Sequence, residues 1–114
     1  MPFGGIDIGS TMTKVVIADE KEQILASHIG PTGAEHRHLA LAVMDETLSQ
    51  AGLSIDQLRF IVATGYGRIN VPFADKQITE ITCHARGIRA LFPSAKVIID
   101  IGGQDSKGIK LDAD

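Results

Sequence analysis

The first third of the chain alternates β-branched runs with turn-forming residues, a pattern that predicts three strands. We place them at residues 5–9, 13–19 and 23–29. The run Val15-Val16-Ile17 is apolar throughout, as in a strand buried on both faces. A charged turn at residues 19–22 separates the second strand from the third. Strands joined by such short connections predict an antiparallel meander.

The rest of the chain alternates helical and strand patterns. Leu41, Met44, Leu48 and Ala51 recur at helical spacing, and Gly52 is a natural helix stop. Helices between strands require parallel crossovers, so we expect a mixed sheet with helices packed on it. The predicted elements are a helix over 35–51, a strand over 59–64, a helix over 78–92 that Gly87 could break, and strands over 96–101 and 106–111.

One nine-residue pattern occurs twice. Ile6-Asp7-Ile8-Gly9-Ser10-Thr11-Met12-Thr13-Lys14 aligns without a gap with Ile99-Asp100-Ile101-Gly102-Gly103-Gln104-Asp105-Ser106-Lys107. Two copies in register indicate a duplicated unit. We therefore expect residues 5–9 and 97–101 to be neighbouring parts of one sheet, with the loops that follow them at the same edge.

Each copy carries the chemistry that a phosphate needs. The glycine after the strand permits a tight turn and a close approach of the backbone to a ligand. Small hydroxyl residues, backbone N–H groups and a lysine then supply several donors and a positive charge. The aspartate at the strand end is placed to hold Mg²⁺, usually through water. The alternative is a hairpin whose aspartate and hydroxyl only satisfy the backbone of the turn.

Four segments, in this order, resemble the ATPase activators of 2-hydroxyacyl-CoA dehydratases and the related ATPase subunits of benzoyl-CoA reductases. These proteins share a superfamily with actin, the sugar kinases and the large heat-shock chaperones. The resemblance implies an α/β fold, the ribonuclease H-like half-domain of the actin-like ATPases. It also implies a fragment, with that half-domain over residues 1–105 and the truncated first strand of the second over residues 106–114. The four segments are Asp7–Lys14, Ala63–Arg68, Glu80–Gly87 and Asp100–Asp105.

The resemblance also implies roles for the two repeats. Asp7, Asp100 and Gln104 would be catalytic, with the two aspartates serving Mg²⁺ or the attacking water. ATP phosphates would contact Gly9, Ser10, Thr11, Thr13 and Lys14 in the first copy and Gly102 and Gly103 in the second. Arg68 could hold a phosphate or a carboxylate, or be a surface residue of a strand-to-helix connection.

Cys83 is the only cysteine. By composition alone, a single cysteine is more often a small buried apolar residue than a ligand. In the resembled family, the matching cysteine is one of two per subunit that ligate a [4Fe–4S] cluster shared across a homodimer, which needs four thiolates. The second cysteine is absent here, so the sequence does not predict a complete cluster. His84 is either a substitute ligand or a residue with a local role.

Composition excludes several other functions. The net charge is −3 without a basic run, and aromatic residues make up 4% of the chain, which disfavours nucleic acid and anionic membranes as partners. No apolar run approaches the roughly 20 residues that span a bilayer, and no signal peptide is visible. We expect a cytoplasmic location.

The resemblance therefore implies the N-terminal part of an ATP-hydrolysing activator of anaerobic metabolism. It would pass an electron from its cluster to a dehydratase or reductase that acts on a CoA thioester. Two alternatives remain at this stage. One is a sugar-kinase-like phosphotransferase half-domain, and the other is an inactive folded fragment.

Asp100→Asn in the intact protein is expected to abolish ATP hydrolysis while sparing nucleotide binding. Losing one carboxylate harms the placement of Mg²⁺ or water more than it harms the many backbone contacts to the nucleotide. Turnover and the dissociation constant for ATP test this. An equal loss of both would contradict the assigned role.

Overall fold

The computed structural model describes residues 1–101 and 106–111, except for the side chains of Asp100, Ser106 and Lys107. It divides the chain into two compact units, Met1–Gln77 and Ile78–Asp114. The elements, in chain order, are β1 (Phe3–Ile8), β2 (Met12–Ala18), β3 (Ile24–Pro31), α1 (His36–Gln50), the 3-10 helix η1 (Ile55–Gln57), β4 (Phe60–Thr64), the 3-10 helix η2 (Arg68–Asn70), β5 (Lys76–Gln77), α2 (Glu80–Leu91), β6 (Val97–Ile101) and β7 (Ser106–Lys110).

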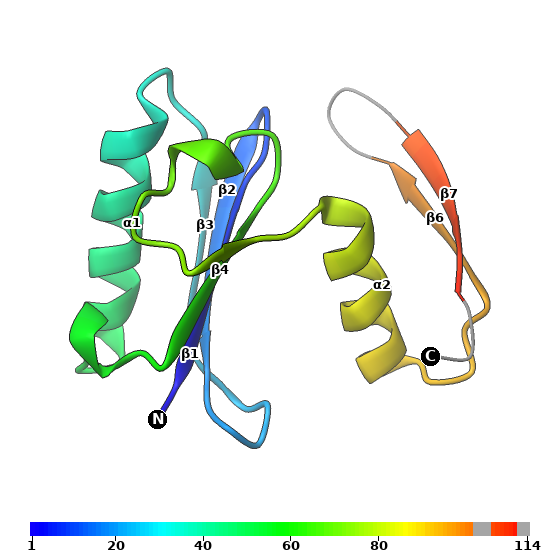
Figure 1. The fold of residues 1–114 in the computed structure, drawn as a ribbon, viewed down its shortest axis with the longest axis horizontal. Coiled ribbons are helices and arrows are strands. Elements are labelled where there is room, and N and C mark those ends of the chain that lie inside the picture. Colours follow the sequence, from blue (N-terminus) through cyan, green and yellow to red (C-terminus); the bar gives the residue numbers. More distant parts are fainter. Residues whose placement is uncertain (102–105, 112–114) are drawn as a thin grey trace. The chain divides into compact units, whose positions relative to one another are not determined.

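The first unit is a five-stranded mixed sheet in the order β3-β2-β1-β4-β5. Strands β1, β2 and β3 form the predicted antiparallel meander. The chain then passes through α1 and returns as β4, which pairs with β1 in parallel. Figure 1 shows α1 lying along one face of this sheet. The predicted α/β fold with a mixed sheet is confirmed.

The core lies between α1 and the face of the sheet that it covers. Met44 and Leu48 of α1 are buried against strand residues such as Ile6 and Val15. The strands alternate between this face and the opposite one. Val16 is therefore exposed between two buried neighbours, and the prediction of a strand buried on both faces is wrong for β2.

The ends of α1 agree with the predicted bounds to within one residue. Gly52 follows the helix with a φ of +69°. Its N–H donates to the Ser49 carbonyl, and the N–H of Leu53 donates to the Leu48 carbonyl, a glycine-based helix stop. Leu41 is 49% exposed, so it does not belong to the buried stripe to which its spacing assigned it.

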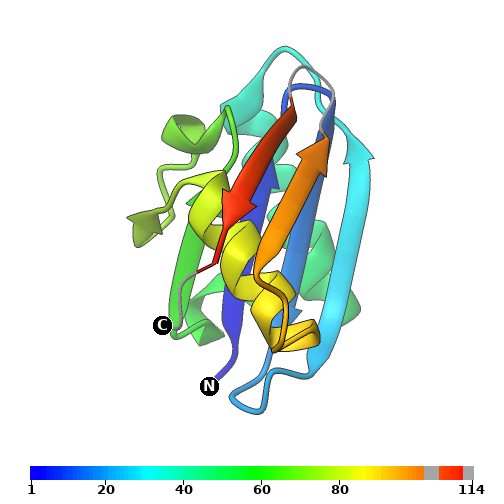
Figure 2. The same cartoon turned by 90° about the vertical axis from the view of Figure 1, so that its right-hand side faces the viewer.

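The second unit contains α2 and the hairpin of β6 and β7. Helix α2 runs through Gly87 without a break. Strands β6 and β7 lie side by side in a two-stranded sheet of their own (Figure 2), and the five-stranded sheet does not include them, so the prediction that residues 5–9 and 97–101 share one sheet is wrong. The predicted boundary between residues 105 and 106 falls inside this hairpin. In the part of the chain that the structure describes, no helix is long and apolar enough to cross a membrane.

Met44→Ala is expected to lower the free energy of unfolding by about 2–5 kcal/mol, because it leaves a cavity at a fully buried position. Leu41→Ala on the same helix is the control and should change it by no more than about 0.5 kcal/mol. Urea denaturation measures both. Similar losses for the two variants would mean that the exposed and buried faces of α1 are assigned incorrectly.

Candidate active site at the end of β1

The turn between β1 and β2 is held by a backbone hydrogen bond. The N–H of Gly9 donates to the carbonyl oxygen of Met12 over 3.0 Å. A Cβ at Gly9 would lie 2.9 Å from that oxygen, so a side chain would disturb the turn. Ser10 and Thr11 lie exposed at its tip. The glycine of the repeated pattern therefore serves close packing within the turn, and the two hydroxyl residues face solvent.

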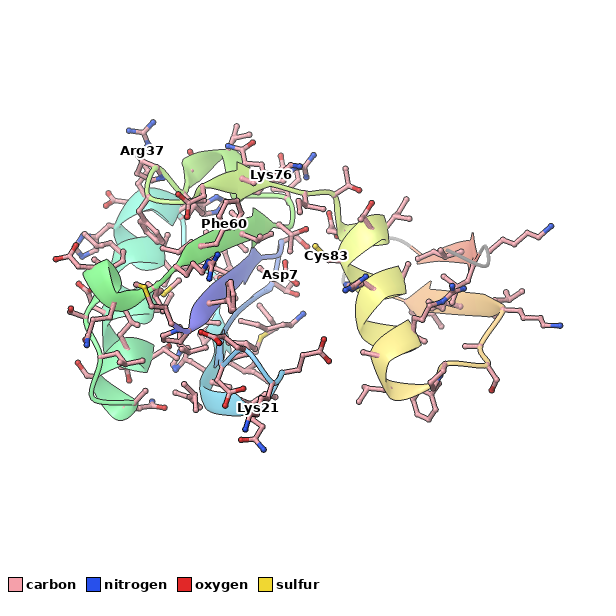
Figure 3. The ribbon with its side chains drawn as sticks, turned by 60° about the horizontal axis from the view of Figure 1, so that its bottom comes forward. Asp7, Lys21, Arg37, Phe60, Lys76 and Cys83 are labelled. Atoms are coloured by element: carbon pink, nitrogen blue, oxygen red, sulfur yellow. The ribbon has the colours of Figure 1, made fainter. Side chains whose placement is uncertain are left out.

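Asp7 and Lys14 face each other at the base of this turn. They are register partners in the β1–β2 hairpin. The Nζ atom of Lys14 lies 3.6 Å from Oδ2 of Asp7, and the two side chains are 50% and 21% exposed. Figure 3 shows the Asp7 side chain at the end of β1. A partly exposed carboxylate beside a half-exposed ammonium group is suited to a metal-bound phosphate.

Thr13 is not part of this group. Its side chain is 1% exposed on the α1 side of the sheet, and its hydroxyl lies 2.7 Å from the hydroxyl of Thr32. The N–H of Thr32 also donates to the Thr11 carbonyl over 2.8 Å, so Thr32, which follows β3, stabilises the β1–β2 turn. Thr32 was not among the site residues expected from the sequence. Strand alternation puts Thr13 on the same face as Val15, and the packing of α1 shows that this face is the buried one.

A second turn, the one that follows β4, closes over the end of β1. Gly65 has a φ of +90°. A Cβ there would overlap the Asp7 carboxylate and lie 2.5 Å from the carbonyl oxygen of Ile8. The same Ile8 carbonyl accepts a hydrogen bond from the N–H of Gly67 over 2.8 Å. The predicted Ala63–Arg68 segment therefore forms one side of the candidate site. Gly65 lies so close to Asp7 and Ile8, and Gly67 so close to Ile8, that a side chain at either position would collide with them.

Arg68 turns back onto this wall. Its Nη1 atom donates to the Gly65 carbonyl over 3.0 Å, and its backbone N–H donates to the same oxygen over 3.2 Å. The guanidinium thus stabilises the turn itself. The suggestion that it holds a phosphate or carboxylate stays a prediction for its remaining donors.

The second copy of the repeat has the same backbone register as the first. Asp100 pairs with Lys107 across β6 and β7, as Asp7 pairs with Lys14 across β1 and β2. The sequence repeat is therefore also a repeated hairpin. The side chain of Asp100 and the predicted site residues Gly102, Gly103 and Gln104 lie outside what the structure describes.

Cys83 lies in the first turns of α2, half-buried and without a disulfide. With His84, Ile88 and Ile99 it lines an open hollow of about 440 Å³ within the second unit. Among the described residues, no three His, Cys, Asp or Glu side chains gather into a metal-binding group. The chain offers one thiolate, and a [4Fe–4S] cluster needs four, so these residues do not complete a cluster site.

Gly65→Ala is expected to destabilise the protein more than Gly52→Ala. Both substitutions force a side chain onto left-handed backbone, which costs about 1–2 kcal/mol. Only the Cβ at residue 65 also collides with neighbouring atoms, because nothing lies within 4 Å of one at residue 52. Urea denaturation compares the two variants, and equal losses would show that the turn does not press on Asp7.

Comparisons with known proteins find relatives that are named as activators of CoA-thioester dehydratases. It is 46% identical over 108 residues to the activator of lactoyl-CoA dehydratase from Anaerotignum propionicum, covering 95% of this chain and 41% of that protein. The structure of the activator of 2-hydroxyisocaproyl-CoA dehydratase from Clostridium difficile, solved with bound ADPNP, matches with a TM-score of 0.90 and 43% identity over 99% of this chain and 42% of that one.

A hexokinase of the ROK family from Thermus thermophilus matches with a TM-score of 0.68 and 16% identity, over 99% of this chain and 47% of that one, which shows a shared fold only. The chain spans about two fifths of the length of the two activators that it matches. The model of one family matches residues 5–114, nearly the whole chain. The chain belongs to the BadF/BadG/BcrA/BcrD ATPase family.

Proposed function

We propose that this chain is the N-terminal part of an ATP-hydrolysing activator of a dehydratase that acts on a CoA thioester. The observation that carries the proposal is the group at the end of β1, where Asp7 and Lys14 face each other below the exposed Ser10 and Thr11. Membership in an ATPase family and the ADPNP bound by a solved relative support it.

In this proposal, the β1–β2 turn binds the ATP phosphates. Lys14 supplies a positive charge, and the hydroxyls of Ser10 and Thr11 supply donors. Asp7 offers a carboxylate oxygen, the ligand type that Mg²⁺ prefers, and so fits a hydrated Mg²⁺. The metal would neutralise charge on the phosphates. Hydrolysis then depends on positioning and charge neutralisation, and not on a covalent intermediate with the protein.

The repeated hairpin is evidence that a second half-domain begins within this chain. Because β6 and β7 reproduce the register of β1 and β2, we propose that the second half-domain starts at β6, ahead of the boundary at residue 106 expected from the sequence. In this proposal Asp100 keeps the role expected from the sequence, which is to serve Mg²⁺ or the attacking water.

Electron transfer requires more than this chain contains. Cys83 would be one ligand of a cluster shared between two copies, and the remaining ligands would have to come from elsewhere in the intact homodimer. A dehydratase is preferred to a reductase as the partner, because the activators of high identity are named for dehydratases. The sugar-kinase-like alternative rests on fold alone.

The intact protein is expected to release phosphate from ATP in the presence of Mg²⁺ without a sugar acceptor. Asp7→Asn should lower turnover at least about 100-fold, as expected for a lost charge-stabilising group. Asp45→Asn, at an exposed position on α1, is the control and should leave turnover unchanged. Turnover that persists in Asp7→Asn would remove the basis of the proposal.

The 114-residue chain alone should neither hydrolyse ATP nor hold a stable cluster. Its phosphate loops form only part of an ATP site, and closure between domains completes such sites. Anaerobic reconstitution with iron and sulfide, followed by absorption spectroscopy and a phosphate assay, tests both statements. A stoichiometric cluster together with Mg²⁺-dependent phosphate release would refute them.

A further inference from the structure

Thr64, the last residue of β4, has a buried hydroxyl group whose hydrogen bonding is not satisfied by the described residues. The side chain is 8% exposed. Among the described side chains, its Oγ1 is the buried polar atom for which no hydrogen-bond partner is found. Other buried threonines differ, since the hydroxyl of Thr47 donates to the Val43 carbonyl over 2.6 Å. A buried polar atom without a partner is unfavourable, and native proteins keep few of them without a bound water, an ion or a function.

The position of Thr64 connects this hydroxyl to the Asp7 site. Thr64 is the register partner of Asp7 in the parallel β1–β4 pair. Asp7 is also the register partner of Lys14 on its other side. Register partners point to the same face of a sheet, so the three side chains form one row across β2, β1 and β4. Ligands of open α/β sheets gather at the carboxyl ends of parallel strands, which is where Asp7 and Thr64 lie.

The backbone after Thr64 holds this row in place. Gly65 lies so close to Asp7 that a Cβ would overlap the carboxylate. The carbonyl oxygen of Gly65 in turn accepts a hydrogen bond from the Arg68 side chain. The turn therefore fixes the carboxylate relative to β4 before any ligand arrives, as a preorganised site requires.

We propose that the Thr64 hydroxyl is a positioning residue for the metal of the ATP site. It accepts a hydrogen bond from a water of the Mg²⁺ hydration shell that also donates to the Asp7 carboxylate. Magnesium keeps several of its waters when it binds to carboxylates and phosphates, so a second oxygen beside the carboxylate orients that shell. This inference rests on the proposed function and assigns a role to Thr64 at the end of β4, which the proposed phosphate contacts do not explain.

The test uses Thr64→Val, which keeps the shape and removes the hydroxyl, in the intact protein. Its melting temperature without ligand should equal or exceed that of the wild type, because an unpartnered polar atom is lost. In the presence of ADPNP, the increase in melting temperature that Mg²⁺ produces should be smaller for Thr64→Val than for the wild type. The Mg²⁺ concentration that gives half of the maximal increase should be about five- to tenfold higher for the variant. Thr64→Ser should restore wild-type values.

Thr47→Val is the matched control. It removes a buried hydroxyl that does have a partner, so its melting temperature without ligand should fall while its Mg²⁺ requirement stays that of the wild type. A Thr64→Val protein with an unchanged Mg²⁺ requirement overturns the inference. One that melts earlier without ligand, or does not fold, overturns it too, because the hydroxyl then has a structural partner. If Mg²⁺ and ADPNP do not raise the melting temperature of the wild-type protein, that result contradicts the proposed function itself.

Discussion

The parallel pairing of β1 with β4 is the constraint on which the site depends. It places Asp7 between Lys14 of β2 and Thr64 of β4 and brings the glycine turn after β4 against the carboxylate. The register is fixed because the alternate residues of β1, Ile6 and Ile8, are buried in the core with α1. A slip of one residue would exchange the two faces of the strand and bury the aspartate. The packing of α1 therefore determines the chemistry on the opposite face of the sheet.

The buried threonines show how this sheet separates stability from function. Thr13 and Thr47 both lie in the core, and each has a hydrogen-bond partner, so their burial is compensated. Thr64 lies on the Asp7 side of the sheet and is not compensated. A buried polar group that stays unpaired in a native protein calls for an explanation, such as a catalytic role or a bound water or ion.

The two copies of the repeated sequence form hairpins with the same backbone register. Asp7 with Lys14, and Asp100 with Lys107, occupy equivalent register positions. A hairpin is a local structure, set by the turn and the alternation of its two strands, so both copies can form independently of what surrounds them. Which sheet each hairpin joins is a tertiary property, and here the sequence-based expectation of a single shared sheet failed.

Much of the fold was accessible from sequence, because strand and helix periods are local. The repeat, the meander, α1 and α2 followed from spacing and composition, and the first copy of the repeat offered Asp7 and Lys14 as candidates for binding Mg²⁺ and phosphate. The two-residue β5 and the 3-10 helix η2 were missed, since neither is long enough to display a period.

What only the tertiary structure decided is which side chains meet. Thr13, predicted to contact phosphate, is turned into the core because it shares a face with Val15, and periodicity alone does not say which face a helix will cover. Thr64 and Gly65 lie far from Asp7 in sequence and reach it only through the α1 crossover. The sequence by itself determined the chemical groups and the hairpin that carries them. Burial of one sheet face under α1 decided which of those groups form the site, because burial depends on residues that are distant along the chain.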